Sequence, residues 1–444
     1  MAPRDLPDDR PDDRPMTWRE RWRSIRLDTT PLRTSRDFRL LFAAGSVFYL
    51  GAMVTYVAVP FQVYALTGSN LAVGAIGAVE LVPLVVFGLY GGALADHVDR
   101  RRLLVASGLV QAVATAVLAW NAARERPDVA LIFVVAVVLT SASALQRPSR
   151  EALMPRTVRH DELPAANALT SAGMQIGLLL GPTLGGVLIA TAGIAWCFVV
   201  DVVGLLVASA LYRAMRPYPH RAETTPPSLA GIAEGVRYAV GRRDLLGTYL
   251  VDIAAMLLAF PVVVFPALAE EVLRAPELLG LLYSAETVGA MVATALSGWT
   301  GRVHHHGRAI VIAAACYGAA IGCVGLMPDI ALVLVFLALA GAADMISGVF
   351  RSTVWSQTIP EEMRGRLAGI EMLSYSLGPL GGQVRAGVTA DLWSVRGAIA
   401  SGGFACVVGV GATALWLRDF WHYDARTDPH AVAERETRSA DGAA

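Results

Sequence analysis

Long apolar stretches, broken by short polar segments, cover most of the 444-residue chain. A helix needs about 20 mostly apolar residues to cross a bilayer. The predicted spans are 39–66, 71–95, 102–123, 129–153, 163–190, 194–215, 244–269, 277–300, 308–327, 329–354, 364–391 and 396–417. This pattern predicts an all-α polytopic membrane protein with twelve transmembrane helices, six on each side of a polar break.

Polar segments set the predicted domain boundaries. Residues 38–215 and 244–418 are expected to form an N-terminal and a C-terminal six-helix bundle. Residues 1–37 are polar and proline-rich at their start, which predicts a disordered or interfacial cytoplasmic tail, and 419–444 form a second cytoplasmic tail. In the cytoplasmic linker 216–243, apolar residues recur at helical spacing and predict an amphipathic helix along the membrane face.

The charged residues predict the orientation in the membrane. All 37 basic residues are arginine. If the N-terminus is cytoplasmic, 32 arginines lie on that side and four on the other, in agreement with the positive-inside rule. We therefore expect a multi-pass protein of the bacterial cytoplasmic (inner) membrane with both termini in the cytoplasm. The formal net charge is zero, so charge gives no reason to expect a nucleic-acid partner.

Few residues suggest a cofactor or enzymatic chemistry. The four cysteines lie inside apolar runs and lack metal or disulfide spacing. The run His304-His305-His306 has no acidic or cysteine companions, so no metal site is predicted. No phosphate-binding loop or serine triad is apparent. The sequence predicts a non-enzymatic membrane protein without a cofactor.

The two halves echo each other. Gly177-Leu-Leu-Leu-Gly-Pro-Thr-Leu-Gly-Gly186 in the fifth predicted span has a counterpart in Gly378-Pro-Leu-Gly-Gly382, six spans later. The basic turn at 91–102 has a weaker echo at 297–308, which keeps glycines and two arginines. Recurrence at a six-helix offset in one orientation indicates two parallel six-helix pseudo-repeats. Transporters built in this way place the substrate between the repeats near mid-membrane.

The turn Gly91–Arg102 joins two predicted spans and is strongly basic. Its glycines allow close helix approach, and its carboxylates can cap a helix N-terminus and pair with arginines. Such contacts could hold one conformation and release it in another; the alternative is a charge cluster that only fixes topology. The predicted conformational latch consists of Gly92, Asp96, Asp99, Arg100, Arg101 and Arg102.

This turn resembles the loop signature of the major facilitator superfamily, and the glycine-proline run of the fifth span resembles the antiporter signature of its exporters. The antiporter-type residues are Gly177, Gly181, Pro182, Gly185, Gly186, Gly378, Pro379, Gly381 and Gly382. The segments 193–196, 265–269, 280–283 and 357–366 resemble the bacterial enterobactin-exporter group of the drug:proton antiporter-3 branch. The resemblance implies export of a siderophore or an amphipathic drug in exchange for protons.

Ionisable residues inside predicted spans are costly and are candidates for function. The candidates for proton coupling or substrate contact are Glu80, Glu286, Asp252, Asp344, Glu371, Arg385 and Asp201. Each could instead form an ion pair or a hydrogen bond between helices. We rank Glu80 and Glu286 first, because they occupy comparable places in the second and eighth spans, and Asp201 lowest.

The predicted protein is a monomeric secondary transporter that exports a small organic molecule by alternating access. Its predicted partners are that small-molecule substrate, protons and the lipid bilayer. Two alternatives remain: a proton-coupled uptake permease of the same fold, and a membrane sensor or scaffold that does not transport.

Overall fold

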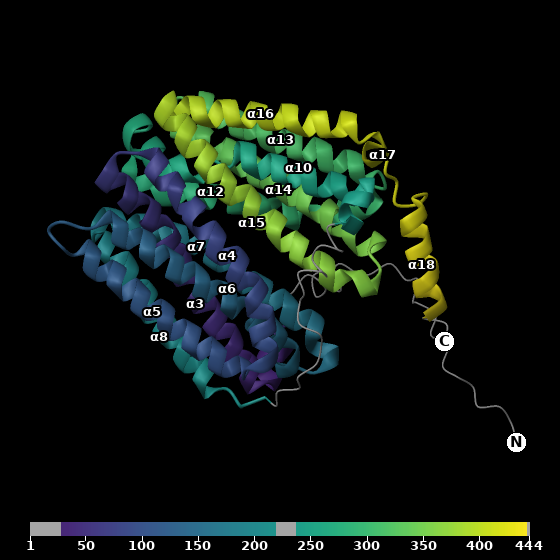
Figure 1. Cartoon of the computed structure of the whole chain (residues 1–444), viewed down its shortest axis with the longest axis horizontal. Helices are drawn as coiled ribbons and strands as arrows, with labels where there is room; N and C mark the ends of the chain where they lie inside the picture. The colour runs from purple at the N-terminus through teal and green to yellow at the C-terminus, as the bar shows by residue number, and fades with distance from the viewer. Residues whose placement is uncertain (1–27, 219–236, 442–444) are drawn as a thin grey trace, which may run out of the picture.

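The computed structural model describes residues 28–218 and 237–441, which fold as helices in two bundles (Figure 1). The N-terminal bundle contains α3 (Arg36–Thr67), α4 (Asn70–His97), α5 (Arg100–Ala122), α6 (Val129–Thr157), α7 (Leu163–Thr191) and α8 (Ile194–Ala214). The C-terminal bundle contains α10 (Arg243–Ala259), α12 (Leu279–Ala295), α13 (His306–Leu326), α14 (Ile330–Thr358), α15 (Glu361–Leu392) and α16 (Val395–Trp416). Shorter helices are α2 (Thr30–Thr34), α11 (Phe265–Ala267), α17 (Arg418–Trp421) and α18 (Pro429–Asp441).

The helices have the length and hydropathy of membrane spans. Within the described residues, 11 segments are long and apolar enough to cross a bilayer. The remaining long helix, α15, has 32 residues and packs beside α4 and α10. The predicted all-α multi-span fold is therefore confirmed, and the count of twelve spans stays a prediction.

The structure repeats itself between the bundles. Helices α6 and α14 both have 29 residues and begin 201 positions apart, at Val129 and Ile330. Each starts after an aspartate whose side chain accepts a hydrogen bond from a backbone N–H of the first turn, which satisfies a donor that the helix leaves unpaired. Helices α8 and α16 also begin 201 positions apart.

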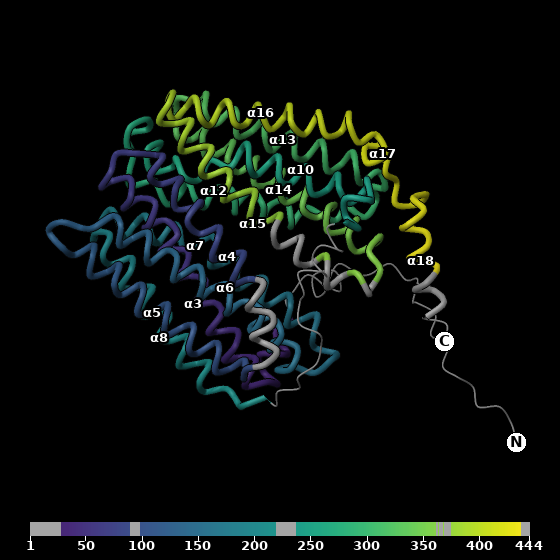
Figure 2. The backbone as a smooth tube through the Cα atoms, viewed as in Figure 1, coloured from purple at the N-terminus to yellow at the C-terminus, as the bar shows by residue number. Residues whose placement is uncertain are grey.

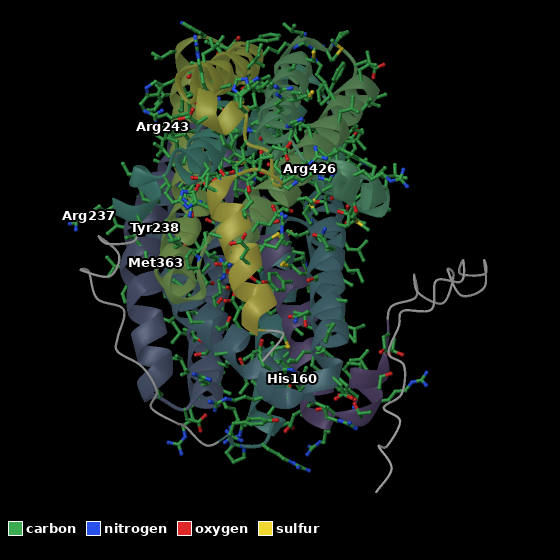
Figure 3. The ribbon with its side chains drawn as sticks, turned by 90° about the vertical axis from the view of Figure 1, so that its right-hand side faces the viewer. His160, Arg237, Tyr238, Arg243, Met363 and Arg426 are labelled. Atoms are coloured by element: carbon green, nitrogen blue, oxygen red, sulfur yellow. The ribbon has the colours of Figure 1, made fainter. Side chains whose placement is uncertain are left out.

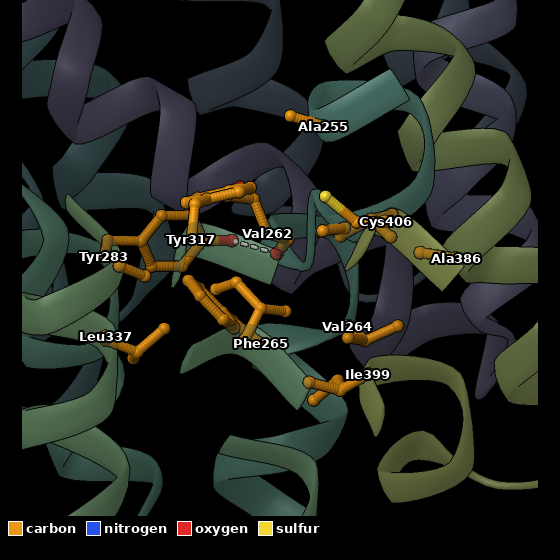
Figure 4. Packing of buried hydrophobic residues seen from close by; sticks show 14 of the residues in the cluster. Ala255, Val262, Val264, Phe265, Tyr283, Tyr317, Leu337, Ala386, Ile399 and Cys406 are labelled. Carbon is orange, nitrogen blue, oxygen red and sulfur yellow. Dashed lines mark hydrogen bonds between the residues drawn. The ribbon is translucent and has the colours of Figure 1, made fainter. Parts of the chain in front are cut away.

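The seventh predicted span is not one continuous helix. Helix α10 ends at Ala259, and Phe260 has an extended backbone because the residue before a proline is pushed out of the helical region. Pro261 has no N–H to continue the helical hydrogen bonds. The chain resumes as a tight turn at Val262–Val264, then α11 and a wider π-helical turn at Leu268–Val272. Figure 4 shows this region, in which the Tyr283 hydroxyl donates to the Val262 carbonyl at 3.4 Å.

The two bundles meet at the end of the molecule opposite α2 and α18, which we call the distal end, and diverge toward these two helices (Figures 1 and 2). At the distal end α7 packs on α12, and a Cβ on Gly186 would lie only 2.6 Å from the Gly280 nitrogen. On the other side α4 packs on α15, where a Cβ on Gly74 would lie 2.6 Å from the Gln383 carbonyl oxygen. Glycines therefore allow backbone-to-backbone contact between the halves.

Asp391 of α15 completes the distal contact. Its carboxylate accepts hydrogen bonds from the backbone N–H groups of Asn70 and Leu71, at 2.9 and 3.0 Å, and from Ser69 Oγ at 2.6 Å. These groups lie at the N-terminus of α4, where an anion is favoured by the helix dipole. The C-terminal bundle thus caps a helix of the N-terminal bundle.

The opposite end, which we call the proximal end, carries α2 and α18 and many basic residues. Figure 3 looks at this end and labels Arg237, Arg243 and Arg426 there. Residues 237–241 of the predicted linker helix are helical, and the rest of that prediction lies outside the described residues. The predicted C-terminal tail forms α17 and α18, with Ala431 buried.

Candidate functional site

A central cavity of about 270 Å³ lies mostly inside the N-terminal bundle. Helices α3, α4, α5, α6 and α8 supply most of its wall, and Val262, Val263 and Gln383 close it from the C-terminal half. Its wall is largely apolar, with a few polar groups. Such cavities are typical of sites for small organic molecules.

Glu80 of α4 lines this cavity, as predicted for a substrate or coupling residue. Thr140 of α6, another lining residue, hydrogen-bonds its carboxylate. The side chain is partly exposed, so the carboxylate can meet a ligand or a proton without unfolding of the bundle.

Asp201 of α8 also lines the cavity, although sequence reasoning ranked it lowest. Thr55 Oγ1 donates to Asp201 Oδ2 at 2.6 Å. The second oxygen, Oδ1, is buried, and no donor among the described residues reaches it. A Cβ on Gly51 would lie 2.5 Å from Oδ1, so this glycine makes room for the carboxylate. Asp201 is therefore both a packing residue and a candidate functional one.

Glu286 does not line the central cavity, although it was ranked beside Glu80. It lies on α12 at the place where this helix packs on α14, and a Cβ on Gly341 would overlap the Glu286 backbone. One turn earlier, Tyr283 packs edge-on against the cavity residue Tyr56, with ring centroids 5.8 Å apart. Glu286 Oε1 is buried and has no hydrogen-bond partner among the described residues.

Asp252 and Asp344 meet around a residue that sequence reasoning missed. Arg351 of α14 is 4% exposed and forms an ion pair with Asp252 of α10. Its other terminal nitrogen lies 3.7 Å from Asp344 Oδ1. Ser374 of α15 donates to Asp252 at 2.9 Å. This arrangement supports the ion-pair interpretation of the two aspartates.

Arg351 was counted among the cytoplasmic arginines, and that assignment is wrong. The side chain lies inside the C-terminal bundle, where it is buried and pairs with Asp252. The correction lowers the count of cytoplasmic arginines by one and leaves the asymmetry intact. The signal available in the sequence was the position of Arg351 inside the predicted span 329–354.

Arg385 of α15 finds a partner on a neighbouring helix. Its Nη1 donates to the Ala398 carbonyl of α16 at 2.9 Å, close to Gly402, which leaves room for the guanidinium. The side chain of Glu371 lies outside the described residues, so no contact of Glu371 is available for comparison. Arg385 does not line the central cavity.

The basic turn has the predicted short form, since α4 ends at His97 and α5 begins at Arg100. Asp99 caps α5 by accepting from the backbone N–H of Arg101 at 2.9 Å. Arg100 donates to a carbonyl of α6, and Arg101 donates to the Met215 carbonyl after α8 at 2.8 Å. These contacts stay within the N-terminal bundle. The backbone of Gly92 and Asp96 is helical, the Asp96 side chain lies outside the described residues, and the latch stays a prediction.

The counterpart of this turn in the second half, residues 297–308, packs against the C-terminal segment. Arg308 lies over the Trp421 ring at 5.7 Å, and His305 lies 3.5 Å from the Asp424 carboxylate. Hydrogen bonds from the backbone and side chain of Arg426 lower the pKa of Asp424. The second copy of the turn therefore serves to attach the C-terminal segment.

The antiporter-type glycines pack helices within each bundle. A Cβ on Gly177 would lie 2.9 Å from Tyr49 Cβ of α3, and Gly181 and Gly185 also face α3. In the other bundle, a Cβ on Gly378 would lie 2.7 Å from Met256 Cβ of α10, and Gly381 and Gly382 also face α10. Gly186 is the exception, because it faces Gly280 across the halves. Pro182 and Pro379 lie within their helices.

Known proteins match this chain along most of its length. A family model described as "Transmembrane secretion effector" matches residues 28–433. The chain belongs to this family of the major facilitator superfamily. Because the family consists of transporters, the protein is a transporter and not an enzyme.

Two relatives of this transporter are named enterobactin exporter EntS. The protein of Escherichia coli strain K12 is 27% identical over 413 residues, which cover 92% of this chain and 98% of the relative. The protein of Shigella boydii serotype 18 is 27% identical over 390 residues, which cover 86% and 92%.

Solved structures share the fold. A bacterial homologue of the human lysosomal transporter Spinster aligns with a TM-score of 0.67 and 15% identity, covering 92% of this chain and 98% of its own. A bacterial homologue of the iron transporter ferroportin aligns with a TM-score of 0.68 and 15% identity, covering 87% and 98%. At these identities the likeness concerns the fold alone.

Proposed function

We propose that this transporter exports a small organic molecule across the cytoplasmic membrane by alternating access, in exchange for protons. The observation that carries the proposal is the central cavity, in which two carboxylates, Glu80 and Asp201, face an otherwise largely apolar wall. An apolar wall suits an amphipathic cargo. A carboxylate that can be protonated and deprotonated suits coupling to a proton gradient.

The conformation supports a loading step. The halves are in contact at the distal end and diverge at the proximal end, which holds the first and last described helices, α2 and α18. With the termini in the cytoplasm, as the arginine distribution predicts, the cavity faces the cytoplasm. An exporter in this state is ready to take up cargo from inside the cell.

The relatives and the glycine motif of α7 support the proposed direction of transport and the proposed cargo. Two relatives carry the name enterobactin exporter, and the family is described by secretion. We therefore propose a siderophore or another amphipathic molecule as cargo. We propose a monomer, since one chain contains both halves of the cavity wall.

Everted membrane vesicles provide the test. With an acidic interior generated by respiration, vesicles that contain the protein should accumulate iron-free enterobactin or ethidium, and a protonophore should abolish the accumulation. Vesicles with the Arg147→Gln variant, changed at an exposed arginine outside the cavity, are the matched control. Absence of accumulation of both compounds contradicts export. Release instead of uptake under the same gradient indicates a permease, and no movement in either direction indicates a sensor or scaffold.

A further inference from the structure

A second cavity, of about 290 Å³, lies between α3, α6 and α7 in the N-terminal bundle. It shares no lining residue with the central cavity. It lies toward the proximal end, because its residues come from the start of α3, the last turns of α6 and the first half of α7. Its polar lining groups are Ser46, Tyr49, Arg150, Glu151, Asn167, Thr170 and Ser171, and the Glu151 carboxylate is paired with Arg147.

Arg150 supplies a positive charge to this cavity. Its Nη2 donates to the Tyr49 hydroxyl at 2.7 Å, and its guanidinium lies over the Tyr49 and Phe48 rings at 4.7 and 5.3 Å. Its Nη1 is buried and has no hydrogen-bond partner among the described residues. The hydroxyl of the fully buried Tyr212 also lies near the Arg150 guanidinium and interacts with it through a side-chain hydrogen bond.

The charge of Arg150 is not balanced within the described part of the chain. No carboxylate there lies within 4 Å of its guanidinium, and the adjacent Glu151 pairs with Arg147 at 2.9 Å. Its counterpart in the other bundle, Arg351, has Asp252 as an ion-pair partner. Arg150 is partly exposed and can therefore meet a ligand. A charge-assisted hydrogen bond from arginine to a carboxylate is among the strongest that proteins form.

We propose that this cavity binds the acidic group, a carboxylate or phenolate, of a small amphipathic molecule, with Arg150 as its anchor. Asn167 and Ser171 can donate further hydrogen bonds to that group. The apolar part of the ligand can lie against Phe42, Met154 and Met174, which also line the cavity.

The position of the cavity gives this site a role in export, and that role rests on the proposed function. Phe48 separates the two cavities, because it lines the central cavity on one side and lies against Arg150 on the other. A molecule held at Arg150 is therefore one aromatic ring away from the central cavity. The site would select acidic cargo at the open end before it moves inward.

Equilibrium binding of radiolabelled benzoate to the purified full-length protein in detergent tests the site. Unlabelled benzoate should displace the label at a concentration at least about ten times lower than benzamide, its neutral analogue, as expected for a charge-assisted bond. Arg150→Gln should abolish this preference. Arg159→Gln, at an exposed arginine that pairs with Asp161 and does not line the cavity, should leave it unchanged.

A second variant makes the test independent of the folding of Arg150→Gln. Asn167→Asp keeps the arginine and places a carboxylate at the exposed edge of the same cavity. Benzoate binding should fall at least about tenfold, because the new carboxylate either pairs with Arg150 or repels the benzoate anion. Size-exclusion chromatography checks that each variant is monodisperse.

Three results would overturn the proposal. They are equal displacement by benzoate and benzamide, unchanged benzoate binding in a folded Arg150→Gln or Asn167→Asp variant, and displacement by inorganic phosphate as effective as that by benzoate. Because binding is measured without a gradient, its outcome is independent of the vesicle assay. Transport without preference for the acid contradicts this site alone, and binding without transport contradicts the export function alone.

Discussion

The two bundles share a fold but use their ionisable residues differently. In the C-terminal bundle, Arg351 and Asp252 neutralise each other in the interior. In the N-terminal bundle, the counterpart Arg150 has no carboxylate partner among the described residues, and Glu80 and Asp201 face a cavity. The comparison indicates that the C-terminal bundle neutralises its buried arginine for structure, whereas the N-terminal bundle keeps the equivalent arginine and two carboxylates at cavities.

Glycine packing, by contrast, is preserved in both bundles. The glycines of α7 face α3, and those of α15 face α10. The repeat therefore retains the residues that set helix distances. Its charged positions differ: Asp201 in α8 has Gly402 as its counterpart in α16, 201 positions later. The two halves therefore share their helix packing but differ in their charged residues, which gives them separate roles.

Removal of Arg351 should have the largest effect on stability. Arg351→Gln leaves Asp252 buried without its ion-pair partner, which typically costs roughly 3–5 kcal/mol. Thermal unfolding in detergent should show a large loss, whereas Arg147→Gln should unfold like the wild type. The double variant Asp252→Asn/Arg351→Gln should lose less than the sum of the single variants. An unchanged unfolding temperature for Arg351→Gln would contradict a structural role for the C-terminal charges.

Added bulk at the distal contact should favour its opening. Gly280→Ala places a Cβ 2.5 Å from the Pro182 carbonyl oxygen, and overpacking of this kind costs about 1–3 kcal/mol. In a Thr183→Cys background, a membrane-impermeant maleimide should label the variant faster from outside. Gly411→Ala, where no atom lies within 4 Å, is the matched control and should not change labelling. Equal rates would mean that Gly280 does not limit closure.

Neutralisation of the cavity carboxylates should impair coupling. Glu80→Gln and Asp201→Asn should each reduce gradient-driven accumulation by about tenfold, equivalent to about 1.4 kcal/mol, with normal folding. Glu286→Gln is the matched comparison, because Glu286 does not line the central cavity. If Glu286→Gln were as harmful as Glu80→Gln, the proposed difference between the bundles would be wrong.

The basic turn should contribute a smaller effect. Asp96→Asn should reduce transport severalfold, because it removes one charge of the predicted latch, and should leave membrane insertion normal. Vesicle transport and the amount of membrane-inserted protein measure the two properties separately. Reduced insertion with normal transport per molecule would instead make the turn a topology signal.

The sequence predicts the helical framework well, because hydropathy and caps are local properties. The short turn before Arg100 and the echo of α7 in α15 follow from residues close together in the chain. The break at Phe260–Pro261 was missed although the proline is visible, because prolines within α3, α4 and α7 do not interrupt those helices. Whether a proline bends or ends a helix depends on the packing around it.

The candidate site is less predictable from sequence. Glu80 lines the central cavity, whereas Glu286, ranked beside it by the same symmetry argument, lies against Gly341. Asp201 also lines the cavity, and the space it occupies beside Gly51 depends on how α8 packs on α3. Arg351 was assigned to the cytoplasm, but its side chain is buried beside Asp252. Each of these outcomes depends on contacts between helices distant in the chain.

The carboxylate of Asp391 has a kinetic consequence. It accepts hydrogen bonds from Ser69, Asn70 and Leu71 at once, so the bundles cannot separate at the distal end until these bonds break together or water replaces them. Closure of the distal end does not have to break these bonds, so they lengthen the lifetime of the closed state without slowing its formation. Asp391 therefore acts as a brake on distal opening alone.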